Sequence, residues 1–189
     1  MQNFDYKKSD MNDVIKLAQE GDINALEEVI RRIQKNVFGM FSYLAENRQD
    51  VADLTQEALL KTAKCISSLK DTKCFKSWLN HIVTNTYHDY TRKAVNDKNI
   101  DVDENTLLEI KDKFGCEPGE KCLFSEMDKI IKIAILSLPL NLRIAIVLRE
   151  YEGLSYEDIS KLTNTTIGTV KSRISRARGK LQQQLKEFI

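Results

Sequence analysis

The stretch LSYEDISKLTNTTIGTVKSRISRAR, from Leu154 to Arg178, predicts two helices joined by a tight turn. Ser155 is placed to cap a short first helix over 156–162, and Thr166 is placed to cap a longer second one. Asn164 stands in the turn, where the backbone is usually left-handed, a conformation that Asn tolerates better than most residues. Apolar residues expected to pack between the helices recur at helical spacing: Ile159, Leu162, Ile167, Val170 and Ile174. This pattern is typical of a helix-turn-helix.

The opposite face of the second helix is basic and rich in hydroxyl groups. It carries Thr169, Lys171, Ser172, Arg173, Ser175, Arg176 and Arg178. Lys and Arg donate hydrogen bonds to guanine edges or phosphates, and Ser and Thr reach base edges or backbone. The pattern therefore favours a helix that reads DNA over a basic helix that is merely solvated.

The rest of the 189 residues is also predicted to be helical. Only seven glycines and two prolines occur, and apolar residues recur every three or four positions. Further helices are expected over 11–20, 23–44, 51–67, 74–93, 123–136 and 139–151. We therefore expect an all-α protein, with the first four of these helices forming one bundle.

Charge is distributed unevenly, although the net charge is only +1. Residues 61–93 carry seven cations against two acids, and residues 166–181 carry five cations and no acid. Residues 97–121, by contrast, carry eight acids and four lysines. Together with the weak periodicity of this segment, the charge predicts three units: a helical domain over 1–94, an acidic flexible linker over 95–122 and a helix-turn-helix domain over 123–189.

Several classes of function find no support in the sequence. No glycine-rich phosphate loop or nucleophile motif occurs, so we expect neither enzymatic activity nor a cofactor. The four cysteines form no C-x-x-C pair and the two histidines stand apart from them, so no metal site is expected. No apolar stretch approaches the roughly 20 residues of a membrane span, and the polar N-terminus does not resemble a signal peptide, so a cytoplasmic protein is expected.

Aromatic residues are interleaved with the basic block of the first domain, at Phe75, Trp78, Tyr87 and Tyr90. Such a mixture suits unstacked bases and their backbone. For Phe75 and Trp78, however, packing in the core is the favoured interpretation.

These residues together resemble the extracytoplasmic-function (ECF) sigma factors of bacterial RNA polymerase. The stretch quoted first, preceded by Ser-Leu-Pro at 137–139, resembles region 4 of that family. Region 2 is resembled, in the same order and spacing, by AQEGDINAL (18–26), DLTQEALLK (53–61) and FKSWLNHIVTNTYHDYTRK (75–93). The resemblance covers nearly the whole chain. Region 3 is absent, as it is in ECF factors. The chain departs from the family pattern at Asn164 and Thr166, where glycine and proline are common.

The resemblance implies a factor that directs core RNA polymerase to promoters by binding the minus-35 element and melting the minus-10 element. Region 2 would contact the beta-prime clamp helices through Asp50, Asp53, Gln56 and Glu57. The minus-10 element would meet Lys73, Lys76, Asn80, Thr84, Asn85, Arg92 and Lys93. Region 4 would read the minus-35 element with Lys171, Ser172, Ser175 and Arg176, and would hold phosphates with Arg149, Thr169, Arg173 and Arg178.

The same resemblance implies further partners. The far face of region 4 would meet the polymerase beta flap, and the linker would thread the active-site cleft. An anti-sigma factor would hold the free monomer inactive by clamping its two domains.

On the residues alone, two other functions stay open. One is a helix-turn-helix regulator that acts without polymerase, which leaves the pattern at 53–61 unexplained. The other is an adaptor that binds proteins through its helical faces.

Overall fold

A computed structural model describes residues 5–97 and 126–186 of the chain. Within these ranges every regular element is helical, which confirms the predicted all-α class. The acidic linker predicted over 95–122 lies almost wholly outside the described residues, as does the predicted helix start near Leu123.

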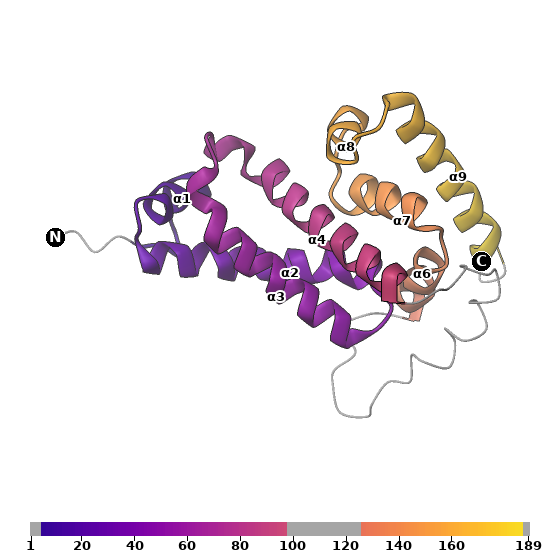
Figure 1. Ribbon diagram of the computed structural model, residues 1–189, viewed down its shortest axis with the longest axis horizontal. Helices are drawn as coiled ribbons and strands as arrows, with labels where there is room; N and C mark the ends of the chain where they lie inside the picture. Colours follow the sequence, from indigo (N-terminus) through magenta and orange to yellow (C-terminus); the bar gives the residue numbers. More distant parts are fainter. Residues whose placement is uncertain (1–4, 98–125, 187–189) are drawn as a thin grey trace.

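The N-terminal unit contains four α-helices, with two short 3-10 turns before the last of them. They are α1 (Met11–Gln19), α2 (Ile23–Leu44), α3 (Arg48–Cys65), η1 (Ile66–Ser68), η2 (Thr72–Cys74) and α4 (Phe75–Asp97). The C-terminal unit contains α6 (Glu126–Leu136), α7 (Leu140–Ile146), the π-helical turn η3 (Val147–Tyr151), α8 (Tyr156–Leu162) and α9 (Ile167–Leu185). Figure 1 shows the C-terminal unit gathered at one end of the elongated N-terminal bundle.

Side chains just before each helix fix where the helices begin. The carboxylates of Asp10 and Asp22 accept hydrogen bonds from backbone amides in the first turns of α1 and α2, as predicted. Helix α3 was predicted to begin at Val51, and this was wrong. It begins at Arg48 because the side chain of Asn47 accepts from the amide of Asp50, which adds nearly one turn.

The core of the N-terminal bundle is built around one stripe of α2. Val29, Ile33, Val37, Met40 and Phe41 are all buried on it, against α1 and α3. Burying one side chain of this size contributes about 1.5–3 kcal/mol, so the stripe is the main source of cohesion in the bundle. Phe75 is buried and Trp78 packs against the same core, in agreement with the structural interpretation of both residues.

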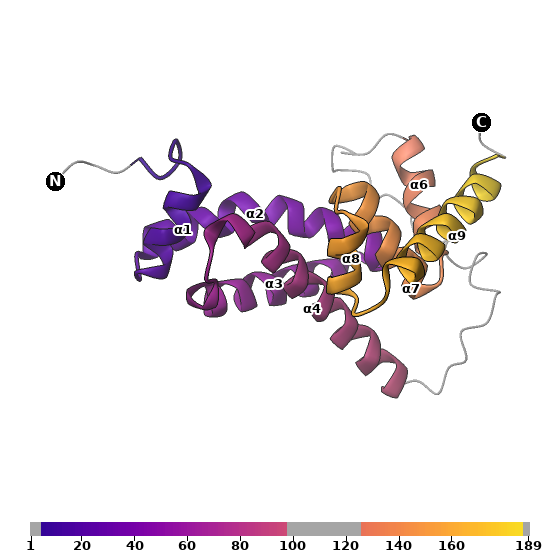
Figure 2. The ribbon, with the colours of Figure 1, turned by 90° about the horizontal axis from the view of Figure 1, so that it is seen from above.

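The two units pack against each other, which the sequence analysis did not anticipate. Helix α2 contacts both α6 and η3, and α4 contacts α8. Figure 2, turned by a right angle, shows the C-terminal helices over the same end of the bundle. Buried apolar residues of both units form one continuous cluster.

The helix-turn-helix has the predicted local geometry. Ser155 caps α8 and Thr166 caps α9, each by accepting from a backbone amide three residues further on. Asn164 lies in the left-handed region, with φ of 48°. Val170 and Ile174 are buried, but Ile167 is 39% exposed, so its predicted inward packing was wrong. As the first residue of α9, it projects beyond the contact between the two helices.

The turn gives a prediction about the stability of this unit. Asn164→Val is expected to lower the free energy of unfolding by about 1–2 kcal/mol, because a branched side chain clashes with the backbone at positive φ. Asn164→Gly is the matched control and should keep the unfolding free energy within about 0.5 kcal/mol of wild type, because Gly adopts this conformation without a clash. Urea unfolding followed by circular dichroism measures both values. Equal stability of the Val variant and wild type would contradict the strained-turn account.

Candidate nucleic-acid interface

The basic face of α9 lies at the surface of the C-terminal unit. Lys171, Ser172, Ser175 and Arg176 are exposed, whereas Val170, Ile174 and Ala177 on the opposite side are buried. The guanidinium of Arg176 lies back along the helix, where its Nε donates to the carbonyl of Ser172 over 3.3 Å. Polar donors therefore project from one side of a helix that its apolar side anchors, which is the arrangement needed to enter a major groove.

Two arginines predicted to hold phosphates already have partners within the chain. Arg178 pairs with Glu150 at 2.6 Å, and both side chains are about half exposed. An ion pair so open to water contributes little, so Arg178 can exchange this partner for a phosphate at small cost. Arg149 is more firmly held: it donates to the carbonyl of Leu154 over 2.6 Å, and its guanidinium lies 4.9 Å from the ring centroid of Tyr156.

The residues predicted to meet the minus-10 element fall into two groups. Lys73, Lys76, Asn85, Arg92 and Lys93 are exposed on η2 and α4. Asn80 and Thr84 are instead buried, at 1% and 3% exposure. In this conformation the cations of η2 and α4 are therefore exposed to solvent, whereas two uncharged polar side chains of α4 are buried.

The burial of Asn80 coincides with a polar cluster that sequence reasoning missed. The carboxylate of Glu152, which is 4% exposed, accepts from the side-chain amides of Asn36 over 2.9 Å and Asn80 over 3.3 Å. The ammonium of Lys76 lies 3.6 Å from the same carboxylate and donates to the backbone carbonyl of Glu152 over 2.9 Å. Because these partners stand 72 to 116 positions away from Glu152, no local sequence pattern signals the cluster.

The pKa of His88 on α4 responds to a charge on the C-terminal unit. Partial burial lowers the pKa of His88, and the positive charges of Arg92 and of Arg173 on α9 lower it further. The basic face of α9 and the distal part of α4 thus lie near enough for their charges to interact.

The residues predicted to contact polymerase lie along α3. Asp53, Gln56 and Glu57 are exposed. Asp50 is half-buried, and its carboxylate accepts from the hydroxyl of Tyr90 over 2.5 Å. Burial of Tyr90, and then this hydrogen bond, raise the pKa of Tyr90. Asp50 is thus bound to α4, whereas the partners of Asp53 and Glu57 lie on α3 itself: Gln49 donates to Asp53 over 3.1 Å, and Lys61 pairs with Glu57 at 2.7 Å.

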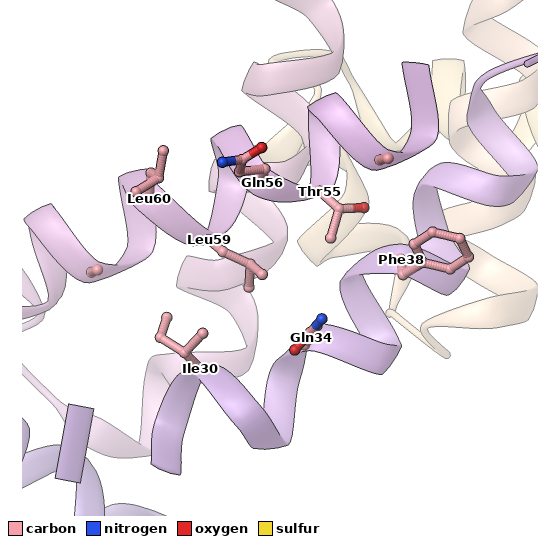
Figure 3. A pocket seen from close by; sticks show the side chains of 9 residues that line it. Ile30, Gln34, Phe38, Thr55, Gln56, Leu59 and Leu60 are labelled. Carbon is pink, nitrogen blue, oxygen red and sulfur yellow. The ribbon is translucent and has the colours of Figure 1, made fainter. Parts of the chain in front are cut away.

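An apolar groove of about 450 Å³ runs between α2 and α3 beside these residues. Figure 3 shows Ile30 and Phe38 of α2 facing the α3 side chains across it. Phe38 is 39% and Leu60 52% exposed, so large apolar surfaces stand open to water. The groove is lined by Ile30, Gln34, Phe38, Ala52, Thr55, Gln56, Leu59, Leu60 and Ala63.

Residues 5–97 and 126–186 hold no group of three or more His, Cys, Asp or Glu side chains that could bind a metal ion. None of the helices described is both long enough and apolar enough to span a bilayer.

Comparison with known protein families and sequences gives consistent matches. Residues 29–96 match the family model of sigma-70 region 2, and residues 130–181 match that of sigma-70 region 4. The ECF RNA polymerase sigma-E factor of Haemophilus influenzae is 34% identical over 93% of this chain and 95% of its own length. The sigma-E factor of Escherichia coli K12 is 33% identical over 93% and 94% of the two chains.

Solved structures give the same match in three dimensions. The sigma factor RpoE of Bartonella quintana, solved in complex with the anti-sigma factor NepR, superposes with a TM-score of 0.67 at 25% identity. The match covers 87% of this chain and 98% of that one. CnrH, solved with the cytosolic domain of CnrY, shares the fold with a TM-score of 0.64 at 18% identity, over 97% of this chain and 99% of that one.

Proposed function

Because the chain belongs to the extracytoplasmic-function family of RNA polymerase sigma factors, we propose that α9 reads the minus-35 element and α4 engages the minus-10 element of its promoters. A factor of this family is a transcription initiation factor and not an enzyme. The proposal is carried by one observation: the chain combines two units. The C-terminal unit is a helix-turn-helix with an exposed basic helix, and the N-terminal unit has exposed cations on α4 and an open apolar groove between α2 and α3.

Recognition of the minus-35 element is assigned to the exposed side of α9. Lys171 and Arg176 would donate to base edges, and Ser172 and Ser175 would reach bases or phosphates. Thr169 and Arg173, both half-buried, lie on the flanks of this face and are assigned to the DNA backbone. Arg178 would join them by exchanging Glu150 for a phosphate, while Arg149, held by Leu154, would contribute mainly by shaping the turn before α8.

Melting of the minus-10 element is assigned to η2 and α4. The exposed cations Lys73, Lys76, Arg92 and Lys93 would follow the phosphates of the single strand. Asn80, Thr84 and Asn85 would contact unstacked bases. Capture of those bases offsets the few kcal/mol needed to unstack each one, so opening requires no nucleotide hydrolysis.

Binding to core polymerase is assigned to the groove between α2 and α3. An open apolar groove with polar residues on its rim suits a partner helix, and the beta-prime clamp helices are the partner that the family implies. Gln56 lines the groove, and Asp53 and Glu57 lie exposed on the same helix, where they would form its polar rim. We propose that Asp50 mainly holds this surface of α3 in place, through its hydrogen bond with Tyr90 of α4, and does not mainly contact polymerase itself.

Further partners follow from the same assignment. The C-terminal unit would meet the beta flap with a face other than the basic face of α9. The two structural relatives were solved with the anti-sigma factor NepR and with the cytosolic domain of CnrY. We propose an anti-sigma factor for this chain too, and we expect the free chain to be a monomer. Its place of action is then the cytoplasm, with the polymerase.

Reconstituted transcription tests the function directly. Purified core polymerase, with and without this protein, is supplied with fragmented genomic DNA, and the 5′ ends of the transcripts are sequenced. Starts that depend on the protein and share two spaced upstream motifs are expected. No dependence, with a working polymerase control, would favour a regulator that acts without polymerase.

The groove gives a second prediction. Leu60→Glu is expected to weaken binding to core polymerase by roughly tenfold or more, because a charge would be buried against the partner's apolar side chains. Lys64→Gln is the matched control: it makes the same change in charge at an exposed position of α3 outside the groove. Fluorescence anisotropy with labelled protein measures both affinities. Equal weakening in the two variants would reject the groove as the docking site.

The basic face of α9 gives a third prediction. Arg176→Ala should remove about 1–3 kcal/mol of preference at a single base pair of the minus-35 element, because its donors would be aimed at a base edge. Arg178→Ala should keep the preference and lower the salt dependence of binding by about one phosphate contact. Holoenzyme binding to a minus-35 library at several salt concentrations separates the two effects. A uniform loss across sequences for Arg176→Ala would contradict its assignment to a base.

A further inference from the structure

We propose that Gln19 of α1 is a positioning residue for recognition of the minus-10 element. Its side-chain amide holds the connection between α3 and α4, residues 66–74, in the shape that meets DNA. The inference rests on the proposed function, because this connection contains η2 and leads directly into α4. It gives a function to the stretch 18–26, which resembles region 2 but carries none of the residues assigned to DNA or to polymerase.

The side chain of Gln19 reaches from the end of α1 to the connection. Its Nε2 donates to the carbonyl of Ile66 over 3.0 Å and to the carbonyl of Leu69 over 2.6 Å. The two carbonyls stand at the two ends of η1, because Ile66 is its first residue and Leu69 follows its last. A side-chain amide nitrogen carries two N–H groups, and both have an acceptor here. The opposite orientation would place the amide oxygen against two carbonyl oxygens, so the chemistry selects this one.

Gln19 itself is held firmly by the fold of α1. The helix ends in a turn in which the amide of Asp22 donates to the carbonyl of Leu17 over 3.0 Å. Gly21 provides the left-handed residue of this turn, with φ of 96°. The apolar face of α1 is buried in the bundle through Val14, Ile15 and Ala18. The position from which Gln19 donates is therefore fixed independently of the connection.

The connection has a buried side and an exposed side. Ile66 and Leu69 are only 4% and 7% exposed. Packing and hydrogen bonding therefore fix the same two residues, since the carbonyls that Gln19 holds are theirs. Figures 1 and 2 both show α1 beside this connection. The side chains left exposed along it are polar or charged: Ser67, Ser68, Lys70, Asp71 and Lys73.

Gln19 acts on recognition without contacting DNA. Its side chain is half-buried, and its amide hydrogens are engaged by the backbone. A segment that is already ordered loses less conformational freedom on binding than a mobile one. Fixing the backbone also fixes where the exposed side chains of the connection stand relative to Lys76 at the start of α4. Loss of Gln19 should therefore reduce discrimination between bases, although no contact with DNA is removed.

Three variants of the full chain test this proposal. Gln19→Met keeps a side chain of similar length and helix propensity, and removes both donors. Gln19→Lys restores a donor group to the same two carbonyls. Gln183→Met is the matched control, because it makes the first substitution at an exposed position of α9.

Hydrogen–deuterium exchange of the free chain measures the hold on the connection. In Gln19→Met, amides of residues 66–74 should exchange roughly three- to tenfold faster, because lost hydrogen bonds of this kind change a local opening equilibrium by such a factor. Residues 29–41 should exchange as in wild type, which shows that the bundle is folded. Gln19→Lys and Gln183→Met should match wild type. Unchanged exchange over 66–74 in Gln19→Met would overturn the inference and leave the proposed function untouched.

Binding of holoenzyme to a promoter library randomised in a pre-melted minus-10 element measures the effect on recognition. Gln19→Met should lose roughly threefold or more of its preference at one or two adjacent positions, because the connection is no longer ordered before binding. Its minus-35 preference should stay unchanged. Gln19→Lys should regain the minus-10 preference, while its added charge raises affinity for all sequences alike.

Two other outcomes of the library experiment are decisive. A full minus-10 preference in Gln19→Met, despite faster exchange over 66–74, would overturn the positioning role. No minus-10 preference in wild type would overturn the proposed function of α4, and this inference with it.

Discussion

Helix α2 must bury surfaces toward its own bundle and toward the C-terminal unit at once, and the rest of the structure depends on how it does so. Its main stripe, from Val29 to Phe41, holds α1 and α3. Its C-terminal half receives the second unit through Asn36, Gly39 and the carbonyl of Leu44. A third strip, with Ile30 and Phe38, is left open to solvent beside α3. One helix thus supplies a core, a contact between units and one wall of an open apolar groove.

Much of the fold could be predicted because its signals are local. Asp22, Ser155 and Thr166 cap helices within three residues of themselves, and Asn164 takes the left-handed conformation that its place in the turn requires. The errors were local as well. Ile167 fits the apolar spacing, but a first-turn side chain lies beyond the reach of the packed interface. Periodicity alone does not distinguish the end of a stripe from its middle.

The site could be predicted only in part, because a sequence pattern does not show which side chains are already engaged. The exposed face of α9 follows from its buried face, so Lys171 and Arg176 could be placed from spacing alone. The partners of Arg149 and the burial of Asn80 depend on residues brought together by packing. Glu152 is one acid among many in the sequence, and only the meeting of α2, α4 and η3 distinguishes it.

The groove between α2 and α3 stands open in a conformation in which the two units are packed together, and the proposed docking there has a kinetic consequence. If polymerase docks on this groove, as proposed, the first encounter can precede any rearrangement of the C-terminal unit. Any release of the C-terminal unit would then be a step within the bound complex, independent of concentration. With abundant polymerase, the rate at which active holoenzyme forms would level off at the rate of that internal opening, whatever the supply of either partner.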